Sequence, residues 1–165
     1  MQIALRALVP LAAFVSASAG AAETSHNPMR FFEGRTESEG TIKIALKKAY
    51  RTHSTGRGKI QADGTLVLIQ QVRDGNAPPK ERRWVVRQTA PGKFSGTMTE
   101  AVGPVTIEQV GDRFRFRFKM KGGLSAEQWI KPAPSGLAAT TRLTVRKLGL
   151  TVATSVGTIR KLGVR

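Results

Sequence analysis

The sequence contains no cysteine, and this absence limits what can hold the fold together. No disulfide framework is available, so an oxidising compartment would not change the covalent structure. No cysteine follows the apolar N-terminal run either, which excludes a lipoprotein anchor. Since the chain is long enough to bury a core without cross-links, we expect a fold that packing and hydrogen bonds stabilise.

Groups that could perform chemistry are also scarce. The only histidines are His26 and His53, whereas a transition-metal site needs clustered ligands. No serine lies in a nucleophile elbow, and Glu37 and Glu39 are interpreted as part of a solvated face. The sequence therefore predicts no metal, no cofactor and no enzyme.

Aromatic residues number only ten, and the main cationic run carries its phenylalanines on the opposite face. A platform for single-stranded nucleic acid needs aromatic and cationic side chains on one surface. Specific binding of nucleic acid is therefore not expected.

Long apolar runs are absent after the N-terminus. Residues 7–15 are apolar, and small residues follow from Ser16 to Ala22. This order is typical of a secretory signal peptide, and the run is too short for a permanent membrane helix. We expect residues 1–22 to be the signal peptide and residues 23–165 to be a single domain in the periplasm. A retained N-terminal anchor and secretion to the medium are the alternatives.

Acidic residues are few: 27 Lys and Arg face 11 Asp and Glu, for a net charge of +16. The excess is uneven, because residues 113–165 hold twelve cations and a single acid, Glu127, while residues 61–112 are balanced. Such asymmetry indicates an anionic partner or surface. Behind a signal peptide, that surface would be lipopolysaccharide or acidic phospholipid.

What the sequence does contain is a nine-residue alternation of cationic and apolar side chains. This period of two predicts a strand with one buried face. The buried face is Phe114, Phe116, Phe118 and Met120. The opposite face, called here the cationic ladder, comprises Arg113, Arg115, Arg117, Lys119 and Lys121. Arg142 and Arg146 are expected to extend it from neighbouring strands. The ladder is either a solvated strand face or a contact for an anionic surface.

Turn residues recur at short intervals along the rest of the chain, which is typical of an all-β meander. No stretch shows convincing helical periodicity; residues 44–50 come nearest and are interpreted as strand. A long meander hides its edges best by closing, so we predict an antiparallel up-and-down barrel of about eight to ten strands. The predicted strands are 34–45, 49–61, 65–73, 82–89, 93–99, 105–110, 113–121, 125–131, 137–146 and 150–162.

The order of several short landmarks resembles a family of bacterial envelope proteins of unknown function with a lipocalin-like barrel. The landmarks are Phe32-Glu33-Gly34, Asp63-Gly64, Arg83-Trp84, Phe94-Ser95-Gly96, Val102-Gly103, Glu127-Gln128-Trp129-Ile130 and Lys147-Leu148-Gly149-Leu150. The resemblance implies a fold and an envelope location, but no activity. Family members often carry a lipoprotein cysteine, which this chain lacks, and acidic residues before the late tryptophan, where this chain has Ala126, Glu127 and Gln128.

The leading hypothesis is a non-enzymatic periplasmic barrel that binds an apolar ligand, such as a lipid or acyl chain. Its expected interior lining is Trp84, Phe114, Phe116, Phe118 and Trp129. The alternative is an interaction protein with a packed interior whose cationic face, the ladder with Arg142 and Arg146, docks on anionic lipid or lipopolysaccharide. A third reading is a small outer-membrane barrel with the phenylalanines toward lipid; one tyrosine and two tryptophans are few for its aromatic girdles. The sequence does not indicate an oligomeric state.

Overall fold

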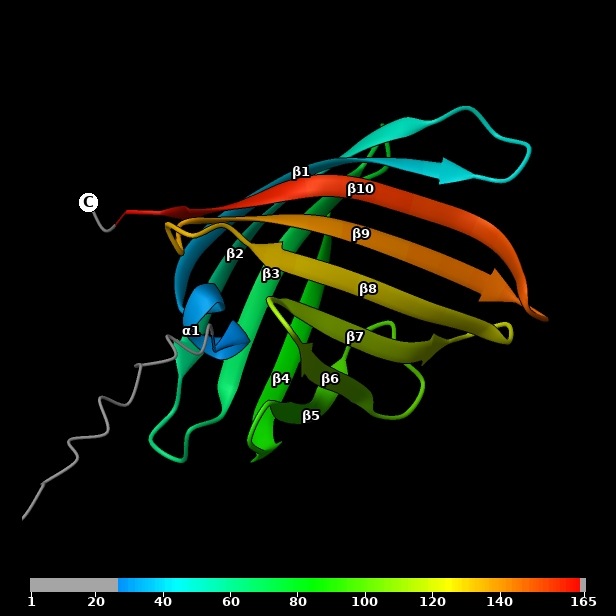
Figure 1. Ribbon diagram of the computed structural model, residues 1–165. Helices are drawn as coiled ribbons and strands as arrows, with labels where there is room; N and C mark the ends of the chain where they lie inside the picture. Colours follow the sequence, from blue (N-terminus) through cyan, green and yellow to red (C-terminus); the bar gives the residue numbers. More distant parts are fainter. Residues whose placement is uncertain (1–26, 164–165) are drawn as a thin grey trace, which may run out of the picture.

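Ten antiparallel strands form a closed barrel in the computed structural model, which describes residues 27–163 (Figure 1). Each strand pairs with its neighbours in sequence, and β10 pairs back with β1 to complete the circle. The predicted all-β, up-and-down barrel is thereby confirmed. The elements are α1 (Pro28–Phe32), β1 (Gly34–Ile44), β2 (Tyr50–Ile60), β3 (Leu66–Asp74), β4 (Lys80–Ala90), β5 (Lys93–Met98), β6 (Val105–Val110), β7 (Arg113–Met120), β8 (Leu124–Pro132), β9 (Ala138–Lys147) and β10 (Leu150–Leu162).

The alternating pattern of β7 decides which face of the sheet is inside. Phe114, Phe116 and Phe118 are at most 8% exposed, while the cations between them lie on the outside. This is the reverse of the orientation that the outer-membrane reading requires. Among the described residues, no helix is long and apolar enough to cross a membrane.

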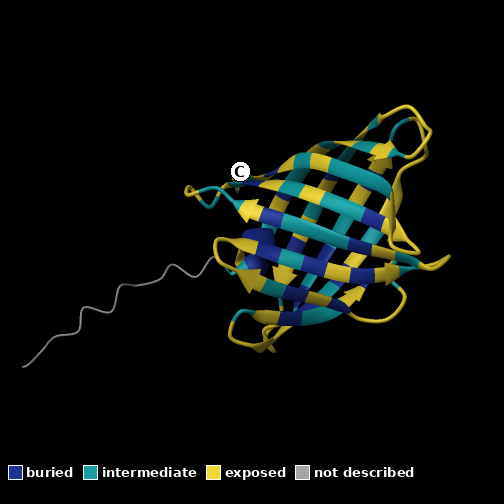
Figure 2. Cartoon of the chain, turned by 45° about the vertical axis from the view of Figure 1, so that its right-hand side comes forward, coloured by how far each residue is buried: buried dark blue, intermediate teal, exposed yellow. Residues whose placement is uncertain are grey.

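The apolar core runs from the end of the barrel that α1 covers to Phe118, Ala126 and Val145 toward the other end. Figure 2 shows buried segments alternating with exposed ones along the strands. The buried apolar side chains come from β3 to β10 and are joined by those of α1. They include Met29, Phe31, Phe32, Leu66, Leu68, Trp84, Val86, Phe94, Val105, Ile107, Phe114, Phe116, Ile130 and Ala139.

Helix α1 covers the end of the barrel at which β1 begins, and the sequence expectation of an all-strand domain missed it. Asn27 caps the helix by accepting a 2.9 Å hydrogen bond from the Met29 backbone N–H, and Pro28 occupies its first turn. Five residues are too few to show a helical period, which explains the omission. The turn at 45–49 corrects a second expectation, because residues 44–50 do not continue the strand.

Gly58 of β2 allows α1 to approach the barrel wall. A Cβ placed on Gly58 would collide with the backbone carbonyl of Phe32. The absence of a side chain at this position therefore sets the position of the plug that seals the barrel.

We expect Gly58→Ala to lower the free energy of unfolding by about 1–3 kcal/mol, because α1 must shift to admit the methyl group. Chemical denaturation of this variant and of Lys59→Ala, whose side chain is exposed on the other face of β2, measures the effect. Equal stability of the two variants would contradict the proposed role of Gly58.

Candidate functional site

A cavity of about 280 Å³ lies along the barrel axis. Its lining runs from Phe32 of the α1 plug to Asp74, Lys80 and Glu100 at the opposite end, called here the mouth. Half of the Lys80 side chain is exposed, so solvent reaches the cavity from the mouth. The site is therefore a pouch with one closed and one open end.

One wall of the pouch is aromatic. The ring of Trp84 meets Phe116 and Phe118 edge-on, with ring centroids 6.2 Å apart in both pairs. The indole N–H of Trp84 donates a 2.8 Å hydrogen bond to the side-chain oxygen of Gln70. Trp84 is thus held in one orientation, and Leu68 and Met98 complete an apolar surface around it.

Much of the remaining lining, on β1, β2, β8 and β9, is polar but already hydrogen-bonded. The hydroxyls of Ser38 and Ser54 lie 2.6 Å apart across β1 and β2, and the Gln128 amide donates to the Thr141 hydroxyl at 2.8 Å. Buried polar groups that already have partners do not need a ligand to stabilise them. This part of the lining can still exchange hydrogen bonds with a bound polar group.

Four charged side chains form a cluster just inside the mouth. Arg82 donates to both carboxylate oxygens of Glu100 at 2.8–2.9 Å. Lys80 lies 3.1 Å from a carboxylate oxygen of Asp74 and 3.7 Å from one of Glu100. The Thr52 hydroxyl donates to Asp74 at 2.7 Å. Since Arg82 and Glu100 are both less than a third exposed, this pair is screened less than surface pairs.

The pKa of the Glu100 carboxyl reflects two opposing effects. Burial raises this pKa, but the hydrogen bonds and charge of Arg82, helped by Lys80, outweigh burial and hold it below the usual 4.5. A carboxyl whose pKa is depressed by folding stabilises the protein above its unfolded pKa. That contribution is lost as the pH falls toward the folded pKa.

The predicted interior residues do not all lie in the pouch. Trp84, Phe116 and Phe118 line it, while Phe114 is buried nearer α1. The interior placement of Trp129 is wrong. In the β7–β8 register Trp129 lies opposite Arg115, so it shares the outer face, and Ile130 takes the buried position beside Phe114.

The cationic ladder lies outside, as expected from its alternation, but it is partly neutralised. Arg115 and Arg117 both bind Glu108 of β6, at 2.7 and 3.0 Å, and Arg113 lies 3.6 Å from Asp112. The guanidinium groups of Arg113 and Arg115 also lie 5.9 and 5.5 Å from the centre of the Trp129 ring.

The outer position of Trp129 therefore has a physical reason, because the tryptophan covers the arginines of β7. The remaining expected contacts are Lys119, Lys121, Arg142 and Arg146. The register places Arg142 beside Trp129 and aligns Lys119, Ser125 and Arg146 across three strands.

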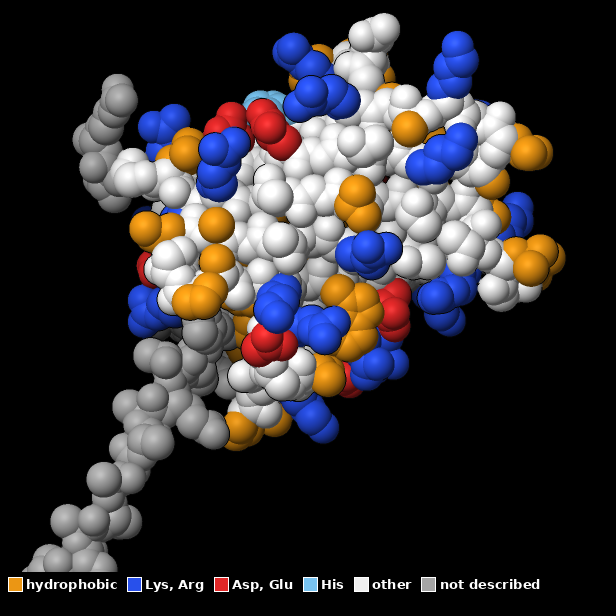
Figure 3. Space-filling model, turned by 45° about the horizontal axis from the view of Figure 1, so that its top comes forward, with side chains coloured by type: hydrophobic (Ala, Val, Ile, Leu, Met, Phe, Trp, Pro, Cys, Tyr) orange, Lys and Arg blue, Asp and Glu red, His pale blue; other side chains and the backbone are white. Residues whose placement is uncertain are grey.

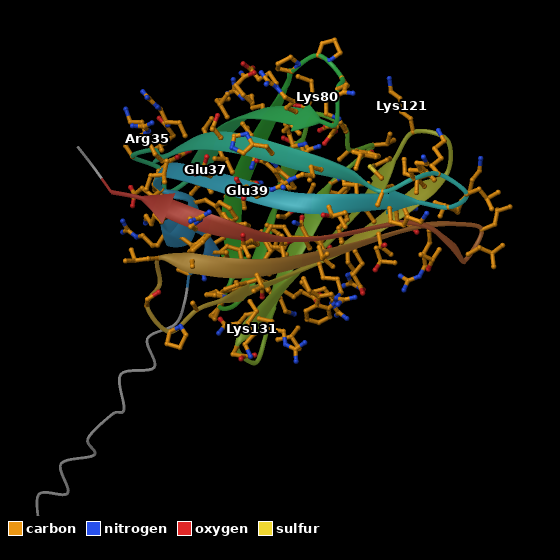
Figure 4. The ribbon with its side chains drawn as sticks, turned by 90° about the horizontal axis from the view of Figure 1, so that it is seen from above. Arg35, Glu37, Glu39, Lys80, Lys121 and Lys131 are labelled. Atoms are coloured by element: carbon orange, nitrogen blue, oxygen red, sulfur yellow. The ribbon has the colours of Figure 1, made fainter. Side chains whose placement is uncertain are left out.

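His53 and the acidic cluster of β1 form no metal site. Glu37 accepts a 2.9 Å hydrogen bond or ion pair from His53 on the outside of the barrel, where Figure 4 shows Glu37 and Glu39 projecting from β1. Within residues 27–163, no group of three or more His, Asp or Glu side chains could hold a metal ion. His26 and the predicted signal peptide lie outside the described residues.

The charged cluster at the mouth was missed by sequence reasoning, although its signal was present. On β3, Gln70 and Asp74 lie on the same inward face as the buried Leu66, Leu68 and Val72. On β4 the same holds for Lys80 and Arg82 with respect to Trp84. Extending the alternation to the ends of these strands would have placed the charges inside.

Comparison with known proteins assigns the chain to a family. The family described as "Protein of unknown function (DUF3833)" matches residues 10–131. The chain belongs to this family. The family of unknown function and the barrel expected from the resemblance are thereby confirmed, while the envelope location stays a prediction. No curated protein matches the chain.

Solved structures share the fold of this DUF3833 member at low sequence identity. The S-type phycobiliprotein lyase CPES from Guillardia theta has a TM-score of 0.66 and 10% identity, over 83% of this chain and 92% of the lyase. A DUF3598 protein of unknown function from Nostoc punctiforme has a TM-score of 0.59 and 8% identity, over 81% and 49% of the two chains. Rv2717c from M. tuberculosis has a TM-score of 0.57 and 13% identity, over 82% and 96%.

The prediction that the chain is not an enzyme is contradicted by this comparison, because one protein with this barrel is a lyase. The absence of a recognisable catalytic motif therefore does not exclude enzymes for this fold. At 10% identity the likeness concerns the fold, and it transfers no residue role to this chain.

We expect Glu100→Gln to lower the free energy of unfolding at neutral pH by about 1–3 kcal/mol, because Arg82 loses its carboxylate. The difference from wild type should shrink as the pH falls from the unfolded value of 4.5 through the lower folded-state pKa, below which native Glu100 is also neutral. Thermal unfolding as a function of pH measures this. Glu81→Gln, on the exposed face of β4 next to Arg82, is the control and should change little. A difference that is independent of pH would show that the charge of Glu100 is not responsible.

Proposed function

We propose that this protein binds a small amphipathic molecule, such as a lipid or an acyl chain, in the pouch. The observation that carries the proposal is the axial cavity of about 280 Å³, bounded by Trp84, Phe116 and Phe118 and closed at one end by α1. Ligand pockets typically enclose about 300–1,000 Å³, and this cavity of about 280 Å³ lies just below that range, so it suits a small ligand.

The distribution of polarity supports an orientation for the ligand. The apolar part would lie against Trp84 and Leu68, toward the closed end, where no charged group lines the cavity. The polar part would lie at the mouth, beside Lys80 and Arg82, whose charges are balanced by Asp74 and Glu100. A ligand without an apolar part would leave the aromatic wall uncovered.

Tryptophan fluorescence provides a direct test, because the chain has two tryptophans on opposite sides of the wall. In Trp129→Phe, Trp84 reports on the pouch alone. In Trp84→Phe, Trp129 reports on the outer surface. We expect dodecanoate to change the emission of Trp84 saturably and to leave that of Trp129 unchanged. Absence of a saturable change at Trp84 would refute binding in the pouch.

A second pair of variants separates binding in the pouch from adsorption to the surface. Ser155 lines the cavity, so Ser155→Phe should fill it and abolish the dodecanoate signal. Thr158 is exposed on the same strand, and Thr158→Phe should retain the signal. Equal binding by the two variants would contradict an interior site.

We further propose that the protein is exported to the periplasm and that residues 1–22 are removed as a signal peptide. The proposal rests on the apolar run at 7–15 and the small residues that precede Glu23. N-terminal sequencing of protein from the periplasmic fraction should begin near Glu23. Leu11→Arg, which interrupts the apolar run, should leave the full-length chain unprocessed. An intact N-terminus in the membrane fraction would instead support the retained anchor.

A further inference from the structure

Exposed leucines are concentrated at the mouth of the barrel. Leu46 is 104% exposed, Leu148 94% and Leu150 74%, and all three lie at the tips of the β1–β2 and β9–β10 hairpins. Val102, in the loop between β5 and β6, is 52% exposed. We call these four residues the leucine rim.

The tips of the rim adjoin one another. The Ala45 N–H donates to the Val152 carbonyl at 2.9 Å, which joins the β1 tip to β10. Leu124 of β8 pairs with Lys147 of β9, and the Val102 N–H donates to the Lys119 carbonyl at 2.8 Å. In Figures 1 and 4 the β1–β2, β7–β8 and β9–β10 hairpins project from the end opposite α1. The rim is therefore a continuous arc around the mouth.

Two of these leucines adopt a backbone conformation that folding alone does not favour. Leu46 has a φ of 61° and Leu148 a φ of 50°, in the left-handed region where glycine and asparagine are preferred. Neither side chain is covered by the barrel, since both are at least 94% exposed. Strain of this kind, without compensating burial, points to a role at the surface.

The rim carries positive charge without local acids. Residues 41–49, 118–125 and 143–155 contain no Asp or Glu. Within the described residues, none of their cations forms an ion pair with an acid. Figure 3 shows hydrophobic and basic side chains together at the right-hand end, with no acid among them on this face. The rim cations are Lys43, Lys47, Lys48, Lys119, Lys121, Arg146 and Lys147.

We propose that the leucine rim docks on an anionic lipid bilayer. The leucines would enter the boundary between headgroups and acyl chains, while the rim cations contact lipid phosphates. Charge complementarity selects this partner, because a second copy of the same positive rim would be repelled. Docking places the mouth of the pouch against the lipid surface. The proposal does not require a ligand in the pouch, so it can fail or succeed independently of the proposed function.

Co-sedimentation with vesicles of equal parts phosphatidylglycerol and phosphatidylcholine tests the proposal. We expect binding at low salt that weakens as salt is added, and weaker binding to pure phosphatidylcholine. Leu46→Asn with Leu148→Asn should weaken partitioning about tenfold for each leucine. Asparagine tolerates the left-handed conformation, so the melting temperature should stay the same or rise. Wild-type binding by this double variant would overturn the proposal.

Matched controls lie at the closed end. Val110 and Leu137 are also exposed there, and Val110→Asn with Leu137→Asn should bind as wild type does.

For the charges, Lys119→Gln with Lys121→Gln should weaken binding about fivefold for each cation. Lys59→Gln with Lys93→Gln, at the closed end, should weaken it much less. Equal loss in both charge variants would indicate attraction by net charge and would refute a specific rim.

Because the chain lacks cysteine, one introduced thiol gives a site-specific probe. An environment-sensitive dye on Leu148→Cys should report an apolar environment when the anionic vesicles are added, and the same dye on Leu137→Cys should not. Sedimentation without vesicles completes the test. Self-association that the two asparagine substitutions abolish, with no vesicle binding, would assign the rim to contacts between copies and overturn the proposal.

Discussion

The pairing of β1 with β10 is the constraint on which the rest of the structure depends. Ten residue pairs, from Arg35–Leu162 to Ile44–Ala153, join the two ends of the meander. Gly157 lies opposite Gly40 at the centre, and a Cβ there would collide with the Glu39 carbonyl. Once this seam closes, no strand has a free edge, and every residue on every strand faces either the pouch or the outside. The pouch, its mouth and the rim all follow from that closure.

The same closure explains which features the sequence could predict. On β7, cations and phenylalanines alternate so regularly that a single face assignment is possible, and the structure has that assignment. On β8, apolar residues occupy both faces of the strand: Ala126 and Ile130 lie on one face and Trp129 on the other. Size and hydrophobicity then favour burying the tryptophan. The preference is overridden by a contact between strands, in which Trp129 covers Arg113 and Arg115. Such a contact depends on how neighbouring strands are aligned, and the residue pattern of a single strand does not specify that alignment.

The charges at the mouth illustrate a second limit of sequence reasoning. Arg82 and Glu100 look like surface residues in isolation, and only the alternation that continues from Trp84 places Arg82 inside. Their partner choice comes from tertiary structure, since Glu100 follows β5 and meets Arg82 across the β4–β5 hairpin. The cation-rich half of the chain was visible from composition. The composition did not show how these cations divide. The ladder arginines are paired with Glu108 and Asp112, whereas Lys119, Lys121 and Arg146 form no ion pair within the part of the chain that the structure describes.

The two ends of the barrel are therefore built for different purposes. At the closed end, α1 covers the core with Met29, Phe31 and Phe32, and it fits closely against β2 at Gly58. At the mouth, backbone strain holds Leu46 and Leu148 in solvent. The rim cations form no ion pair with an acid within residues 27–163. Both features cost stability in an isolated molecule. Glycine at positions 46 and 148 would be more stable in this left-handed conformation, and glycine is the residue found at the left-handed positions Gly75 and Gly149. The requirements of folding therefore do not explain the residues at the mouth. This is the end of the barrel at which we propose that the ligand enters and the bilayer binds.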